Sequence, residues 1–210
     1  VTQAAGLSLK WFKDNFCEDY VEQARGLGVD VYDLINRDIA AVPAGSDRLI
    51  YLPDLMGERT PHLDPDSRGV FFGLSAIHTK AHLLRAVMEG VSYSLRDCNE
   101  ILKEMGIRVD EMMACGGGGK SPVWRQMLAD LYRCAVGTVE QTEGPALGVA
   151  ILAGVGCGLY ESVPAACERL VSKAESTGPS ENAERYEAYH RLYDELYLAL
   201  KDSYRKLADL

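Results

Sequence analysis

Four consecutive glycines between a short apolar run and an amphipathic segment are the feature of this sequence best suited to bind a ligand. The stretch ACGGGGKSPVWRQMLAD occupies residues 114–130, and its glycines are Gly116, Gly117, Gly118 and Gly119. Glycine lets a flat or charged ligand approach the backbone, and the free N–H groups that begin a following helix attract anions. The alternative is a tight turn that only folds the helix back on its strand. The glycines alone do not separate these interpretations.

Two phosphate-binding motifs fit this stretch only in part. A P-loop, G-x-x-x-x-G-K-[ST], matches Gly119, Lys120 and Ser121, but its first glycine falls on Ala114. Pro122 follows the serine directly, so we expect Ser121 to be the N-cap and Pro122 the first residue of a helix, which leaves the lysine outside it. A dinucleotide-binding pattern, G-x-G-x-x-G, that starts on the first glycine of the run fails at Ser121. Both motifs are therefore disfavoured.

Polar residues elsewhere in the chain suggest weaker candidates. His78 and His82 stand four apart, a spacing that could chelate zinc on a helix, but no glutamate follows His78 as H-E-x-x-H requires. We expect a polar pair at a helix start and no metal site. Glu58 and Arg59 lie in a loop rich in Asp and Pro, which either builds turns or gives these two residues an indirect functional role. Glu89 is predicted to be buried and to need a partner, because an unpaired buried carboxylate is costly.

Apolar periodicity predicts the helices that must hold these residues. Spacings of three and four mark residues 1–40, 78–105 and 181–210 as helical. In the second stretch the periodic positions form one stripe that we expect to be buried: Leu84, Val87, Val91, Leu95, Cys98 and Ile101. In the third they are expected to pack a closing helix against the body of the protein: Tyr186, Tyr189, Tyr193, Leu196 and Leu200.

Short apolar runs between these helices predict strands. They occupy residues 48–55, 70–73, 110–115 and 135–140. Further helices are predicted from Ser121 and over residues 146–156, and a polar break at 172–183 precedes the last helix. The order strand, turn, helix, strand, helix around the glycine run is typical of an α/β protein.

Composition excludes several classes of protein. The chain has 210 residues, of which 47% are hydrophobic and 25% charged, as in ordinary globular proteins. A net charge of -9 argues against a nucleic-acid binder, and no apolar run is long enough to cross a membrane. The six cysteines lie far apart without a C-x-x-C pair. We therefore expect reduced, mostly buried thiols and a cytoplasmic protein.

Three stretches together resemble the C-terminal half of the FGGY family of carbohydrate kinases, most closely its xylulokinase branch. They are GERTPHLDPDSRGVFFGLSAIHTKAHLLRAVMEGV, CGGGGKSPVWRQMLAD and EGPALGVAILAG. The second signature of the family places small, apolar, polar and acidic residues in a fixed order, and this sequence supplies them at Gly69, Phe71, Gly73, Leu74, His82, Leu83, Ala86 and Glu89. The resemblance covers residues 1–210 as one domain, with 181–210 as its closing helix.

The resemblance implies a fold and an activity. The fold would be the actin-like ATPase or sugar-kinase domain, related to ribonuclease H, in its C-terminal half and without its first strands. The activity would be transfer of the ATP γ-phosphate to a sugar hydroxyl, with D-xylulose as the expected acceptor and Mg²⁺ as the metal. A kinase for another sugar or polyol and a non-catalytic nucleotide-binding module are the alternatives.

The resemblance also divides the roles between two domains. The catalytic aspartate and the phosphate loop are expected upstream of Val1, together with an N-terminal sugar-binding domain, so this chain would hold no catalytic residue and would be inactive alone. A homodimer is a further expectation. The nucleotide-binding positions implied by the family are Gly116, Gly117, Gly118, Ser121, Gly144 and Ala146. Ser121 takes the place where many relatives carry an asparagine that faces the base.

Overall fold

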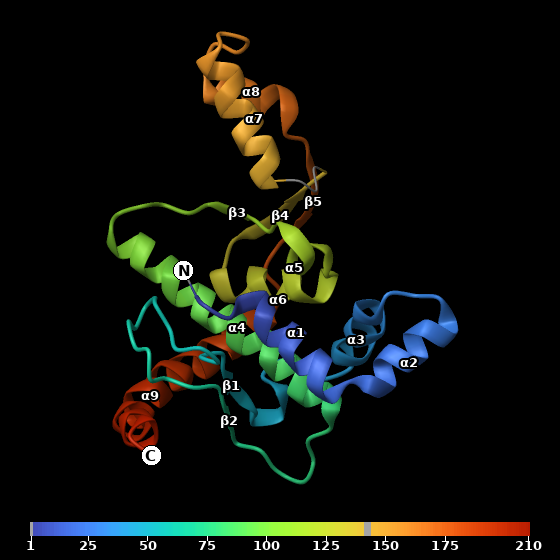
Figure 1. Cartoon of the computed structure of the whole chain (residues 1–210), viewed down its shortest axis with the longest axis vertical. Coiled ribbons are helices and arrows are strands. Elements are labelled where there is room, and N and C mark those ends of the chain that lie inside the picture. The colour runs from blue at the N-terminus through green and yellow to red at the C-terminus, as the bar shows by residue number, and fades with distance from the viewer. Residues whose placement is uncertain (1, 141–143) are drawn as a thin grey trace.

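The computed structural model describes residues 2–140 and 144–210 and shows a chain of mixed helices and strands (Figure 1). This confirms the α/β expectation. The elements in order are α1 (Ala5–Phe16), α2 (Glu18–Leu27), α3 (Val31–Ala40), β1 (Ile50–Leu52), β2 (Val70–Phe72), α4 (Lys80–Glu104), β3 (Glu111–Met113), α5 (Gly116–Lys120), α6 (Pro122–Tyr132), β4 (Ala135–Val139), α7 (Gly144–Gly156), α8 (Val163–Leu170), β5 (Lys173–Thr177) and α9 (Asn182–Ala208).

The strands form two small sheets. β1 and β2 pair antiparallel, with Tyr51 opposite Phe71. In the second sheet β4 lies in the middle, parallel to β3 and antiparallel to β5. Because β3 and β4 are parallel neighbours, their carboxyl ends meet at the same edge of the sheet, where open α/β sheets bind their ligands. The glycine run follows β3 at this edge.

Helix α4 is the centre of the packing. Its predicted stripe is fully buried at Leu84, Val87 and Val91 but only half-buried at Leu95, Cys98 and Ile101. The helix contacts β1, α1, α3, α6 and α9. Gly90 makes the contact with β1 so close that a Cβ there would lie 2.1 Å from the carbonyl oxygen of Tyr51. None of the helices in the described part of the chain is long and apolar enough to span a membrane.

Glu89 lies at the centre of a buried polar network. The network supplies the partners that were predicted for this buried carboxylate. Its carboxylate accepts hydrogen bonds from the backbone N–H of Gly45 (2.9 Å) and the hydroxyl of Ser46 (2.8 Å). Arg85 Nε and the hydroxyl of Tyr186 each donate to its Oε1 at 2.8 Å. Because Tyr186 belongs to α9, the network ties the last helix to α4 and to the segment before β1.

The polar stretch 172–183 and the cysteines depart from expectation. Lys173–Thr177 form β5, an edge strand whose side chains are largely exposed, so no alternation of apolar residues predicts it.

No disulfide joins the six cysteines, all of which lie in the described residues, but only Cys17 is buried, and Cys115 and Cys157 are exposed. The expectation of mostly buried thiols was wrong because both exposed cysteines lie at helix ends, Cys115 before α5 and Cys157 after α7.

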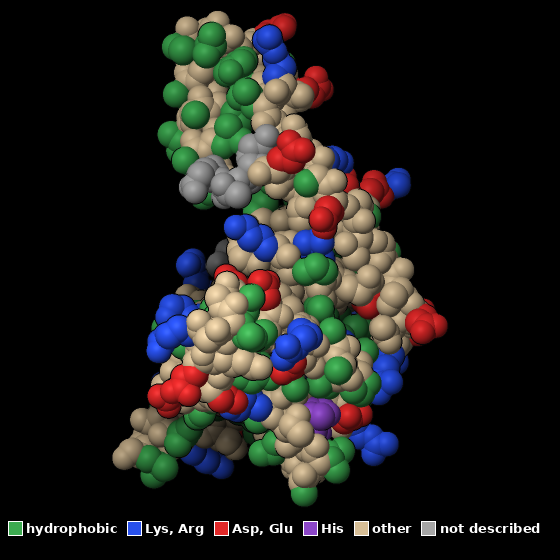
Figure 2. Space-filling view, turned by 90° about the vertical axis from the view of Figure 1, so that its right-hand side faces the viewer, with side chains coloured by type: hydrophobic (Ala, Val, Ile, Leu, Met, Phe, Trp, Pro, Cys, Tyr) green, Lys and Arg blue, Asp and Glu red, His purple; other side chains and the backbone are tan. Residues whose placement is uncertain are grey.

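Helices α7 and α8 project from the body as a hairpin (Figure 1). The predicted helix over 146–156 is confirmed as α7, which packs mainly on α8. A helix that is apolar all round is usually buried, yet Val149 and Leu152 are 68% and 62% exposed. Hydrophobic side chains accordingly gather on the projecting lobe in Figure 2.

Candidate functional site

The glycine run forms one helical turn. Helix α5 (Gly116–Lys120) begins after Cys115, and Gly116 enters it with φ at 74°, a left-handed conformation that favours glycine. The end of the turn is held by Arg125, whose Nη1 donates to the carbonyl of Gly119 at 2.7 Å. The sequence left open whether these glycines form a ligand cradle or only a tight turn. In the structure they form a helical turn, and Arg125 satisfies a carbonyl group at its end.

The glycines differ in what a side chain would meet. A Cβ at Gly119 would lie 2.3 Å from the carbonyl oxygen of Ala114, so the close packing of α5 on the preceding segment requires glycine there. A Cβ at Gly118 would lie 3.3 Å from the indole of Trp124. At Gly117 it would meet no atom within 4 Å. The described residues therefore give no packing reason for glycine at position 117, where the space is open to a ligand.

A cavity of about 380 Å³ lies against these glycines. Its lining comes from α1, α4, α5 and α6 and from strands β3 and β4, and it includes Gly6, Leu95, Gly117, Gly118 and Trp124. The volume lies in the range of small-molecule sites, and an apolar lining beside exposed backbone suits a flat aromatic group. None of the described residues that line it is charged.

A second cavity of about 270 Å³ shares Gly119 with the first. It is the more polar of the two, because Lys120, Arg125, Thr138 and Glu175 contribute to its lining. Arg125 forms an ion pair with Glu175, which ties α6 to β5. Helix α5 therefore separates an apolar cavity from a polar one.

Ser121 holds the wall of the first cavity in place. Its hydroxyl oxygen accepts from the backbone N–H of Trp124 at 3.2 Å, which confirms Ser121 as N-cap and Pro122 as the first residue of α6. The hydroxyl donates in turn to Oδ1 of Asn36 at 2.7 Å. The indole of Trp124 is fixed by its Nε1, which donates to Ser92 at 2.9 Å. Ser121 is 6% exposed and is not among the described residues that line the two cavities.

Gly144 and Ala146 lie at the start of α7 and are exposed. Neither is among the described residues that line the two cavities, so the structure does not bring them into one pocket with Gly117 and Gly118. They follow β4 as the glycine run follows β3. Since these strands are parallel neighbours, both segments start from the same edge of the sheet.

The chain matches the model of a known protein family. The model for the C-terminal domain of the FGGY family of carbohydrate kinases matches residues 1–157. The chain belongs to the FGGY family of carbohydrate kinases. The resemblance read from the glycine run and its flanking stretches is thereby confirmed.

Individual FGGY relatives are similar over nearly the whole chain. It is 36% identical over 203 residues to the xylulose kinase of Bacillus subtilis strain 168, an alignment that covers 96% of the chain and 39% of the relative. It is also 36% identical over 205 residues to the gluconokinase of the same strain, with 97% and 40% covered. The chain therefore spans about two fifths of the length of the curated relatives it matches.

A solved FGGY structure shares the fold. The ligand-bound xylulose kinase from Lactobacillus acidophilus superposes with a TM-score of 0.84 at 28% identity, covering 98% of this chain and 40% of that one. The expected fold, that of the actin-like sugar kinases, is confirmed by this likeness. The α5–α6 segment and its cavity are thus part of an FGGY scaffold.

Sequence reasoning missed several residues of this FGGY cavity. Ala5 and Gly6 at the start of α1 line it, as do Val91 and Leu95 of α4. The two α4 residues were predicted only as core, because a helical stripe does not reveal where packing leaves a gap. For Ala5 and Gly6, the signal in the sequence was that two small residues stand next to each other.

The histidine pair is a helix-start arrangement, as expected. The backbone N–H of Thr79 donates to Nδ1 of His82 at 3.1 Å, and the other ring nitrogen lies 3.1 Å from a carboxylate oxygen of Asp47. The backbone N–H of Ser75 donates to Nδ1 of His78 at 2.9 Å. Both rings therefore have protein partners that fix their orientation at the start of α4.

The long loop before β2 is anchored by Glu58. Its backbone pairs with that of Asp64 in both directions, at 2.9 and 3.0 Å. Its carboxylate accepts from the hydroxyl of Thr2 at 2.6 Å and from the backbone N–H of Gln3 at 2.9 Å. Glu58 thus holds the segment that leads into α1, whereas Arg59 is exposed. An indirect functional role for this pair stays a prediction.

Asp54 lies in the same loop region among other carboxylates. It is 6% exposed, and burial together with the negative charge of Glu58 raises its pKa from 3.8 to about 7. Asp64 and Asp97 act in the same direction, while a hydrogen bond from Ser67 opposes the shift. The folded state therefore binds a proton that the unfolded chain releases at lower pH.

Replacing Asp54 with asparagine should flatten the pH dependence of stability. A raised pKa in the folded state stabilises at low pH, and this stabilisation is lost as the pH rises from 3.8 to about 7. Because a tenfold change in a protonation equilibrium corresponds to roughly 1.4 kcal/mol, the loss is on the order of a few kcal/mol. Urea unfolding at pH 5 and pH 8 measures it, with exposed Asp202→Asn as the control. Equal pH dependence in the wild type and Asp54→Asn would contradict the assignment.

Proposed function

We propose that this chain forms the nucleotide-binding part of an ATP-dependent carbohydrate kinase. The observation that carries the proposal is the open space at Gly117 beside the cavity of about 380 Å³, in a chain of the FGGY family. A flat base fits an uncharged lining that includes Trp124, and the bare backbone of Gly117 and Gly118 lets the ribose approach closely.

The remaining implied positions take different parts in this proposal. Gly116 allows the left-handed entry into α5, and Ser121 orients Trp124 through its cap on α6. A direct contact of Ser121 with the base stays a prediction, as do contacts of Gly144 and Ala146 from the edge of the sheet. Their common origin at the carboxyl ends of β3 and β4 supports the latter.

The residues that line this cavity are not suited to bind Mg²⁺, whereas the phosphates of ATP are. Mg²⁺ prefers oxygen ligands, and no carboxylate of the described residues lines the cavity. We therefore propose that the ion arrives with the phosphates of ATP, where it would neutralise their charge. The residues of this chain bind and orient the base and ribose, so that the γ-phosphate is presented to a sugar hydroxyl held elsewhere. Positioning of this kind supplies much of the catalysis in phosphoryl transfer.

D-Xylulose is the proposed acceptor, and gluconate is the second candidate. The xylulose kinase and the gluconokinase of Bacillus subtilis are equally similar to the chain, at 36% identity each. We further propose that a sugar-binding N-terminal domain completes the protein, that the chain is inactive without it, and that the complete protein works in the cytoplasm as a homodimer. Phosphorylation of D-xylulose and of D-gluconate by the complete protein, compared at equal concentrations, separates the two acceptors.

Calorimetric titration of the chain with magnesium and a non-hydrolysable ATP analogue should show one saturable site. Because the base supplies the contact with the cavity, magnesium tripolyphosphate should neither bind in the same range nor compete. Absence of saturation at millimolar analogue would contradict the proposal, and so would equal binding of tripolyphosphate.

A further inference from the structure

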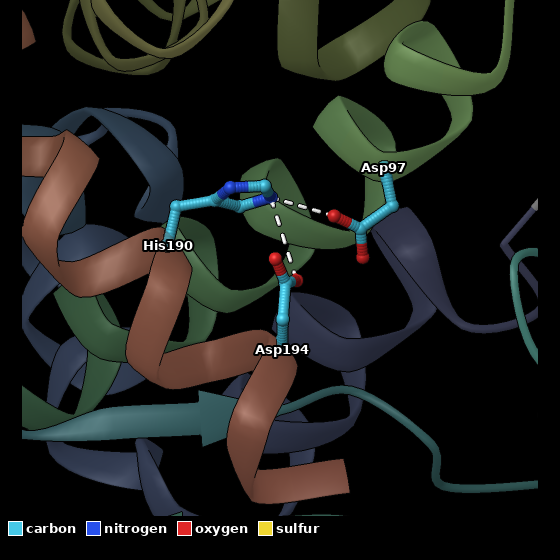
Figure 3. A group of neighbouring side chains, drawn as sticks. All are labelled: Asp97, His190 and Asp194. Atoms are coloured by element: carbon cyan, nitrogen blue, oxygen red, sulfur yellow. Dashed lines mark hydrogen bonds and ion pairs between the residues drawn. The ribbon is translucent and has the colours of Figure 1, made fainter. Parts of the chain in front are cut away.

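The side chains of Asp97, His190 and Asp194 lie close together between α4 and α9 (Figure 3). Nε2 of His190 lies 2.6 Å from Oδ1 of Asp97 and 3.7 Å from Oδ1 of Asp194. One ligand atom of each residue lies within 4.8 Å of the others. No residue of this cluster lines the cavity beside the glycines, so its chemistry is separate from nucleotide binding.

Two helices position the cluster. His190 and Asp194 stand four apart on α9, so their side chains project from the same side of that helix. Asp97 faces them from α4, as Figure 3 shows. A chelating pair on one helix completed by a residue of a facing helix is the way helical bundles build metal sites.

Burial gives the cluster an inner and an outer side. The side chains of His190 and Asp97 are only 7% and 11% exposed, whereas that of Asp194 is 49% exposed. The rings of Tyr93 and Tyr193 pack against the imidazole, with centroids 6.1 and 6.3 Å away. The aromatic rings would shield an ion from water on one side, and the exposed carboxylate would provide its entry path.

The charges of the cluster favour a cation. Two carboxylates that share one small site repel each other, and a divalent ion between them removes this repulsion. The guanidinium of Arg96, which neighbours Asp97 on α4, donates through Nη2 to Glu187 at 2.8 Å, and its Nε lies 3.5 Å from Glu100, while its charge also acts on Asp194. A protonated His190 would neutralise only one of the two negative charges.

The donor set selects the kind of ion. Mg²⁺ and Ca²⁺ take oxygen ligands, whereas an imidazole with two carboxylates suits Zn²⁺ and related transition metals. Zinc binds such atoms at about 2.0–2.2 Å. Ligand atoms around one such ion lie roughly 3 Å or more apart, so His190 and Asp97 need only a small separation from their present 2.6 Å contact.

We propose that Asp97, His190 and Asp194 bind one divalent transition-metal ion of the Zn²⁺ type, which fastens α9 to α4. Water would complete the coordination on the exposed side. The alternative is a hydrogen-bonded His–Asp pair that holds the helices together without an ion.

Titration of the metal-stripped protein with ZnCl₂ tests the proposal. The wild type should bind one Zn²⁺ per chain and gain thermal stability, and Asp194→Asn should lower the affinity at least tenfold and remove that gain. Asp194 is half exposed, so the variant is expected to fold. Glu195→Gln is the matched control, because it removes one exposed negative charge from the next position of α9 without touching the cluster.

Substitution with Co²⁺ tests the donor atoms and the coordination number of the site. The wild type and Glu195→Gln should show the visible absorption of cobalt bound by nitrogen and oxygen in a site of low coordination number, and Asp194→Asn should show it weakened or lost. Equal Zn²⁺ affinity in Asp194→Asn and the wild type would overturn the proposal, as would the absence of saturable binding. MgCl₂ at the same concentrations should leave the thermal stability unchanged.

Discussion

Replacing Gly117 with valine is expected to weaken nucleotide binding by roughly tenfold to a hundredfold and to leave the fold intact. A Cβ at this position would meet no atom within 4 Å, so the side chain is expected to extend into the space proposed for the ribose. Overfilling a packed site costs typically about 1–3 kcal/mol, which corresponds to that range of affinity. Calorimetric titration with magnesium and the ATP analogue measures the loss.

Gly119→Ala is the contrasting variant. Its Cβ would lie 2.3 Å from the carbonyl oxygen of Ala114, so the backbone must move and the protein should lose stability whether or not a ligand is present. Urea unfolding therefore separates the two glycines: Gly117→Val keeps the wild-type midpoint, and Gly119→Ala lowers it. Wild-type affinity in a folded Gly117→Val variant would refute the proposed position of the nucleotide.

Replacing Glu89 with leucine should destabilise the protein by about 3–5 kcal/mol. The substitution removes the acceptor for Gly45, Ser46, Arg85 and Tyr186, and it leaves the guanidinium of Arg85 buried without its counterion. Arg85 would keep its hydrogen bond to the carbonyl of Ile39 at 3.0 Å, which does not compensate a charge. The free energy of unfolding in urea measures the effect.

A double variant distinguishes the lost charge pair from lost packing. The double variant Arg85→Met with Glu89→Leu removes both charges of this pair. It should therefore be more stable than Glu89→Leu alone, which leaves the charge of Arg85 buried. A Glu89→Leu variant that loses less than about 1 kcal/mol would mean that the network does not hold α9 to α4 as described.

The sequence was most informative where local chemistry decides local structure. Ser121 followed by Pro122 predicts the start of α6 correctly, because a cap and a fixed φ act within a few residues. The periodic stripe of α4 identifies the buried face at Leu84, Val87 and Val91 for the same reason. The glycine run marked the candidate site, but the run itself does not reveal that Arg125 of α6 satisfies a carbonyl group at the end of its helical turn.

Features that depend on distant partners could not be predicted in this way. Strand β5 exists because β4 offers it an edge, and its own residues carry no apolar alternation. Gly6 lines the cavity because α1 packs against α4, and His190 meets Asp97 across 93 residues of sequence. The resemblance to FGGY kinases indicated candidate residues, but the gap in the packing became visible only in three dimensions.

The hydrogen bonds between Glu58 and the segment before α1 place the long loop next to the start of the cavity lining. Glu58 holds Thr2 and Gln3, and the cavity begins at Ala5, only two residues further along the chain. Free-energy coupling between two sites is reciprocal. A ligand that binds more tightly when the start of α1 is held in place must therefore strengthen the grip of Glu58 by the same factor. Substitutions in the loop at Glu58 and ligand binding in the cavity would then affect each other to the same degree.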